Sequence, residues 1–84
     1  MVTTSLLELD IMGLLVKVEK LTGVKFSRDI IEVSLEPKLK MLCIRFKKPG
    51  KAELGEPLYP RIHLYTDKDT KEITAVEIID LDKF

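Results

Sequence analysis

The spacing of apolar residues in the first quarter of the chain predicts one amphipathic helix. In residues 5–22, SLLELDIMGLLVKVEKLT, apolar side chains recur every three or four positions. This stripe consists of Leu7, Ile11, Leu14, Val18 and Leu21, and is widened by Leu6, Leu15 and Val16. Ser5 and Glu8 have the spacing of a capping box, and Gly23 stands where a left-handed C-cap residue is expected. We therefore expect a helix over residues 5–22.

After Gly23 the apolar positions alternate with polar ones, which is the period of a half-buried strand. Alternation predicts a strand up to Pro37, with Ile31, Val33 and Leu35 on one face, and a second strand over residues 41–47. Further strands are expected at residues 61–66 and 72–80. Residues 47–60 hold two of the four glycines and three of the four prolines, so we expect one long loop there.

The short connections between these strands favour antiparallel neighbours. The predicted fold is α+β: a single domain over residues 1–84 in which the helix packs on a four-stranded antiparallel meander within residues 29–80. The second face of this sheet would still carry apolar side chains, which marks it as a candidate interface. Its candidate residues are Met41, Cys43, Tyr65, Ile73 and Ile79.

Composition narrows the setting of the protein. A chain of 84 residues makes one small domain, to which burial in a dimer would add stability. The formal net charge of zero argues against general binding to nucleic acid or membranes, and the longest uncharged run, residues 11–16, is too short to cross a bilayer. The single cysteine and the absence of a signal-peptide pattern favour the reducing cytoplasm. The chain has no Asn or Gln and many Lys and Glu, so a thermophilic, archaeal source is expected.

Two segments resemble the small prokaryotic proteins of the family called domain of unknown function 2283. Residues 33–46, VSLEPKLKMLCIRF, resemble its opening motif, and residues 66–79, TDKDTKEITAVEII, resemble its closing motif. The similarity covers residues 31–80 and leaves the helix outside. The matching positions are Pro37, Leu42, Ile44, Arg45, Asp67, Thr70, Glu72, Ile73, Glu77 and Ile78.

The chain departs from that family at several positions: Leu35 replaces a Tyr, Glu36 and Lys40 replace Asp residues, and Lys71 and Ala75 replace Gly residues. The resemblance implies a small meander with a hairpin at the second motif. It implies no activity, because none is established for the family. It does suggest an antitoxin-like, protein-binding role, since members are considered partners of toxin-like neighbours.

The acidic segment at residues 67–72 raises the question of a calcium site. Asp67 and Asp69 have the spacing of the first two ligands of a calcium loop. Lys71, Glu72 and Ile78 then stand where an EF-hand needs a ligand, a glycine and a bidentate glutamate. A hairpin turn whose side chains cap its own backbone is the favoured interpretation, with weak calcium binding as the alternative.

A second candidate is basic. Six cationic residues without an intervening acid lie within fourteen positions: Lys38, Lys40, Arg45, Lys47, Lys48 and Lys51. Such a segment can follow a phosphate backbone, but only Phe46 offers a stacking surface. Lysines that protect a sheet edge, or ion pairs with the acidic C-terminal part, explain the same pattern.

The remaining candidates are Cys43, His63 and Glu77. Cys43 and His63 are too few for a structural zinc site, and a buried, unreactive thiol is expected between Leu42 and Ile44. Glu77 lies in an aliphatic strand, where it is either solvated at an edge or paired with Arg45 or Arg61. We expect no catalytic residue and no cofactor. The leading hypothesis is a non-enzymatic homodimer that acts by protein contact; a calcium- or nucleic-acid-binding module is the alternative.

Overall fold

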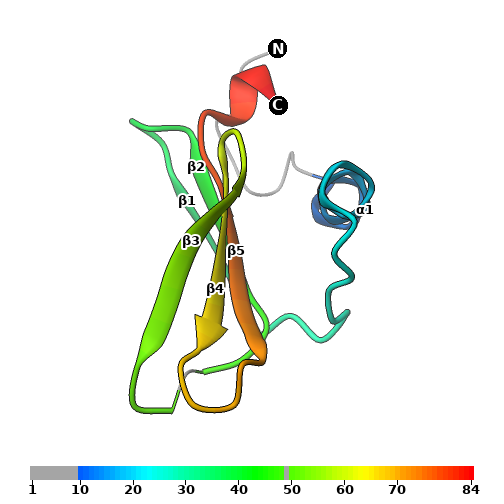
Figure 1. The fold of residues 1–84 in the computed structure, drawn as a ribbon. Helices are drawn as coiled ribbons and strands as arrows, with labels where there is room; N and C mark the ends of the chain where they lie inside the picture. Colours follow the sequence, from blue (N-terminus) through cyan, green and yellow to red (C-terminus); the bar gives the residue numbers. More distant parts are fainter. Residues whose placement is uncertain (1–9, 49) are drawn as a thin grey trace.

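The structure, a computed structural model, describes residues 10–48 and 50–84, without the side chain of Asp82. One helix, α1 (Ile11–Thr22), lies against one face of an antiparallel sheet (Figure 1). The strands are β1 (Glu32–Glu36), β2 (Met41–Arg45), β3 (Glu53–Tyr59), β4 (Ile62–Asp67) and β5 (Ile73–Ile78). A short 3-10 turn, η2 (Leu81–Lys83), follows. The predicted α+β class is confirmed, but the sheet has five strands and not four.

Helix α1 begins one residue after its N-cap, Asp10, whose side chain accepts a hydrogen bond from the Gly13 N–H at 3.0 Å. A side chain at Gly13 would collide with this carboxylate, so the glycine makes room for the cap. The predicted capping box at residues 5–8 lies outside the described residues. The predicted end of the helix is confirmed, because Gly23 is left-handed, with φ 77°.

The buried face of α1 is narrower than the sequence predicts. Leu15 and Val18 are fully buried, and Ile11 and Leu14 pack against the core from its edge. Leu21 and Val16, which were expected in the stripe, are 39% and 38% exposed. The helix therefore rests on the sheet along one line of contacts.

The strand order is β1-β2-β5-β4-β3, which is not a simple meander. Strands β1 and β2 form one hairpin, and β3, β4 and β5 form a local meander. The two units join where β5 pairs with β2, with Ile44 opposite Val76. The connection from β2 to β3 crosses the end of the sheet. The order is therefore different from the one expected from short links alone.

Strand β3 was expected to be loop, because it contains Gly55 and Pro57. It forms at the edge of the sheet, where one side of the backbone needs no partner and a proline is tolerated. Its ladder with β4 shifts register between Pro57 and Tyr59. The pattern of an edge strand carries little alternation, which is why the sequence did not reveal it.

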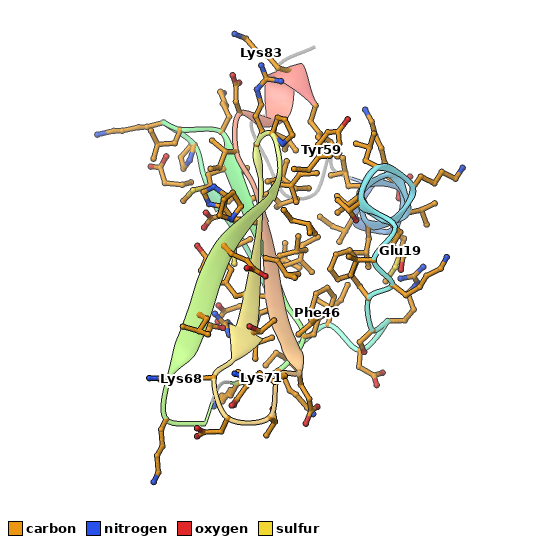
Figure 2. The ribbon with its side chains drawn as sticks, viewed as in Figure 1. Glu19, Phe46, Tyr59, Lys68, Lys71 and Lys83 are labelled. Carbon is orange, nitrogen blue, oxygen red and sulfur yellow. The ribbon has the colours of Figure 1, made fainter. Side chains whose placement is uncertain are left out.

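The core lies between α1 and the three central strands. Leu42, Ile44, Ile62, Val76 and Ile78 are fully buried, and they form the sheet face that α1 covers. Phe46 points into the same layer (Figure 2) and stacks on Phe26 with 5.7 Å between ring centroids. Leu81 of η2 is also buried, and its N–H donates to the Lys40 carbonyl. These contacts attach η2 to the core.

Candidate functional site

The candidate site is the face of the sheet opposite α1, called here the open face, because no described element covers it (Figure 1). The strand registers set its side chains in rows that cross the sheet. One row consists of Ser34, Cys43, Glu77, His63 and Pro57, and the next of Glu32, Arg45, Ala75, Tyr65 and Gly55. Met41 lies beyond the first row.

Glu77 is the centre of the first row. Its side chain is 15% exposed, and the Tyr65 hydroxyl donates to its Oε1 at 3.3 Å. The Nδ1 of His63 lies 3.5 Å from the same oxygen. Burial, and the nearby charge of Glu77, raise the pKa of Tyr65. Neither Arg45 nor Arg61 pairs with Glu77, so the partners expected from the sequence are wrong, and so is the solvated alternative.

Arg45 binds Glu53 of the edge strand β3 instead. Its two guanidinium nitrogens donate to the two carboxylate oxygens at 2.9 and 3.3 Å. The Thr74 hydroxyl also donates to Glu53. The hydrogen bond from Arg45 is the main cause that lowers the pKa of Glu53. This pair spans β5 and β4 and fixes both side chains on the open face.

Tyr65 covers Gly55 of the edge strand. A Cβ added at Gly55 would lie 2.6 Å from Cε1 of the tyrosine ring. The glycine therefore provides the space in which the ring lies flat over β3. Because its hydroxyl is bonded to Glu77, the ring is held at both ends.

Three of the predicted interface residues, Met41, Cys43 and Tyr65, are half-buried, and register places them on the open face. Ile73 is not there: a β-bulge shifts the register between Tyr65 and Thr66, and Ile73 packs against the core. A one-residue shift moves a side chain to the other face of the sheet. Ile79 follows β5 and is half-buried, with its N–H bonded to the Arg61 carbonyl.

Cys43 and His63 lie in the same row but on strands separated by β5. Burial raises the pKa of the Cys43 thiol, which disfavours the thiolate that a nucleophile or ligand needs. Within residues 10–48 and 50–84 no three His, Cys, Asp or Glu side chains are arranged to hold a metal ion. The row is therefore a packed polar contact and has the geometry of neither a zinc site nor a Cys–His pair.

In the acidic segment, the side chain of Asp67 stabilises the backbone of two loops. It is buried, and its carboxylate accepts the backbone N–H groups of Asp69 and Thr70 at 2.8 and 3.1 Å and that of Gly50 at 2.8 Å. These bonds lower the pKa of Asp67. Asp69 is exposed and contributes its backbone, not its carboxylate. The favoured turn is observed, because the Asp67 carboxylate caps its backbone N–H groups.

The six basic residues do not form one patch. Lys38 and Lys40 lie in the turn between β1 and β2, whereas Lys47, Lys48 and Lys51 lie beyond the opposite end of β2. Arg45 is bound to Glu53, and Lys47 to Glu72. The two groups therefore lie at opposite ends of the sheet. In Figure 2, Lys68 and Lys71 mark one of these ends and Lys83 marks the other. Nucleic acid would meet two small clusters rather than a continuous surface.

Near the second cluster lies a groove of about 460 Å³. Its lining residues are Ser27, Asp29, Phe46, Lys47, Glu72 and Ile73. Lys47 and Glu72, which form an ion pair, line this groove together with the apolar side chains of Phe46 and Ile73. No predicted site residue other than Lys47 and Ile73 reaches it.

Sequence reasoning missed one buried carboxylate, Glu19, on the inner side of α1 (Figure 2). Both of its oxygens bind the guanidinium of Arg28, at 2.7 and 3.0 Å, and one also accepts the Phe26 N–H at 2.8 Å. These bonds lower the pKa of Glu19 to about 2. No spacing rule links Glu19 to Arg28, because the connection after α1 is irregular.

Comparison of the chain with protein-family models, with curated proteins and with solved structures finds no match in any of the three. The resemblance to domain of unknown function 2283 therefore stays a prediction. Among the described residues, no helix has the length and apolar character to cross a membrane.

Proposed function

We propose that the protein is a non-enzymatic protein-interaction module that acts as a homodimer in the cytoplasm and uses its open face to contact another protein. The observation that carries this proposal is that a full sheet face with half-buried Met41, Cys43 and Tyr65 has no described element over it. Exposed sheet faces with aromatic, methionine and arginine side chains are typical of interfaces.

The fixed positions of the side chains on the open face also support the proposed interaction. The Glu77–Tyr65 and Arg45–Glu53 contacts hold four long side chains in place before any partner arrives. Association then costs less side-chain entropy, because the groups are already immobilised. Satisfied polar groups around a few apolar ones also favour a specific partner over general adhesion.

The chemistry of the face favours binding over catalysis. A nucleophile needs an accessible thiolate or an adjacent base, whereas burial raises the pKa of the Cys43 thiol, and β5 separates Cys43 from His63, which contacts Glu77. An antitoxin-like, protein-binding role, as the family resemblance implies, fits this mode of action. Both an antitoxin-like protein and the proposed interaction module would recognise their partner through a preformed surface.

The experiment is affinity purification of the tagged protein from its own cells. Met41→Lys and His63→Glu change the open face without touching the core, and both should lose whichever protein co-purifies with the wild type. Val16→Glu is the matched control, because Val16 is 38% exposed on the opposite side of the molecule. Circular dichroism confirms that all three variants fold. Retention of the partner by both open-face variants, or its loss in Val16→Glu, would contradict the proposal.

A further inference from the structure

The two edges of the sheet differ in how well they can accept another strand. At the β3 edge, Pro57 lacks an N–H, and the ladder is irregular between Pro57 and Tyr59. At the β1 edge, all five residues from Glu32 to Glu36 are in regular register with β2, and none of them is proline or glycine. An edge strand of this kind presents an outward row of unpaired N–H and C=O groups.

The side chains along β1 sort by face. Val33 and Leu35 are half-buried on the helix side, where they pack against the core. Ile31, just before the strand, is 53% exposed. Glu32, Ser34 and Glu36 alternate with them and lie on the open side of the sheet. The edge thus has an apolar row on one side and an acidic row on the other.

We propose that a second copy of this chain pairs antiparallel with β1, with Val33 opposite Val33 of the second copy, and joins the two five-stranded sheets into one. This inference rests on the homodimer of the proposed function and names the surface that forms it. It is an extension of the sheet by main-chain hydrogen bonds, with side-chain pairs that set the register.

Charge and packing select this register. If the strands were centred on Ser34, Glu32 would lie opposite Glu36 of the second copy at both ends, and like charges directly opposite are destabilising. Centred on Val33, Glu32 lies opposite Ser34, so that no two acidic residues lie opposite each other. Centring on Leu35 would bring Pro37 into the ladder and leave Ile31 exposed. A register shifted by one residue from any of these would place the apolar side chains of one β1 strand opposite the acidic side chains of the other.

Self-association through the open face is less favourable. Packing two such faces would remove water from Glu77, His63, Arg45 and Glu53, and buried polar groups are costly unless they find partners. An edge-to-edge dimer has its twofold axis perpendicular to the sheet. Both open faces then lie on the same side of the dimer and stay free for another protein.

Disulfide trapping tests the inference. In a Cys43→Ala background, Val33→Cys places two thiols across the twofold axis, at the separation of directly opposed residues in an antiparallel pair. Under mild oxidation we expect most of this variant to become a covalent dimer. Ser34→Cys and Leu54→Cys, the latter on the β3 edge and 47% exposed in the wild type, are the matched controls and should stay largely monomeric in denaturing gels.

Light scattering of the wild type separates the two proposals. A wild-type dimer whose Val33→Cys variant does not cross-link overturns the β1 contact but leaves the homodimer standing. Preferential cross-linking of Ser34→Cys overturns the register, and that of Leu54→Cys overturns the choice of edge. A wild-type monomer at high micromolar concentration, together with no cross-link at Val33, overturns both.

Discussion

At the scale of single residues, Asp67 joins two connections that are distant in the sequence. Its carboxylate caps the turn between β4 and β5 and also holds Gly50 in the crossing from β2 to β3. The sequence allowed the turn to be predicted, because an aspartate commonly bonds the backbone two residues later. The bond to Gly50 could not be predicted, since it depends on the strand order.

We predict that Asp67→Asn lowers the thermal midpoint. An asparagine can accept the turn N–H groups with its oxygen, but its amide nitrogen then faces the Gly50 N–H, and two donors cannot bond. Thermal unfolding followed by circular dichroism measures the change. Asp69→Asn, at an exposed side chain, is the control and should leave the midpoint unchanged. Equal midpoints for the two variants would mean that the Gly50 contact contributes nothing.

Glu19 predicts a specific dependence of stability on pH. Its folded pKa of about 2 lies below its ordinary value of 4.5, so the unfolded chain binds more protons between these values. The stabilisation is complete above about pH 4.5 and is lost as the pH falls towards 2. Urea unfolding from pH 6 to pH 2.5 should show this loss. In Glu19→Gln the slope should be shallower, and an unchanged slope would refute the assignment.

At the scale of elements, alternation revealed β1, β2, β4 and β5 but not β3, and it did not give their order. An edge strand with Gly55 and Pro57 has the composition of a loop, and only its neighbour β4 makes it a strand. The sequence did not indicate the β-bulge in β5 either, because the alternation of ITAVEI is equally compatible with a regular strand. Met41, Cys43 and Tyr65 lie on the expected face of the sheet. Ile73 lies on the other face, against the core, because of that bulge.

Gly55 gives a test of how β3 is held. An alanine normally stabilises a strand position relative to glycine, but here its Cβ would lie 2.6 Å from the Tyr65 ring. We expect Gly55→Ala to destabilise the wild type by about 1 kcal/mol in urea unfolding. In a Tyr65→Ala background the same change should be neutral or stabilising. Destabilisation of the same size in both backgrounds would show that the ring is not the obstacle.

At the scale of the whole molecule, composition remains the only indication of the source. The chain contains no Asn or Gln, and Lys and Glu supply 19 of its 28 charged residues. Ion pairs that cross between elements, such as Arg45–Glu53 and Arg28–Glu19, are the kind that retain their value at high temperature.

We therefore predict a thermal midpoint above roughly 80 °C at neutral pH. Differential scanning calorimetry measures it directly, and a repeated scan shows whether unfolding is reversible. Because dimerisation would make the midpoint depend on protein concentration, the scans should cover at least a tenfold range of concentration. A midpoint in the range of mesophilic domains would overturn the inference about the source.

The position of β5 between β2 and β4 has a consequence for how the chain folds. The β1–β2 hairpin and the β3–β4 hairpin can each form from neighbouring residues on a microsecond scale. The pairing of Ile44 with Val76 must wait, because all of β3 and β4 lies between them in the sequence. Loop-closure entropy makes that pairing the slow step. Until it occurs, the molecule consists of the β1–β2 hairpin and the β3–β4–β5 meander, each with unpaired edges, and the pairing of β5 with β2 makes them one sheet.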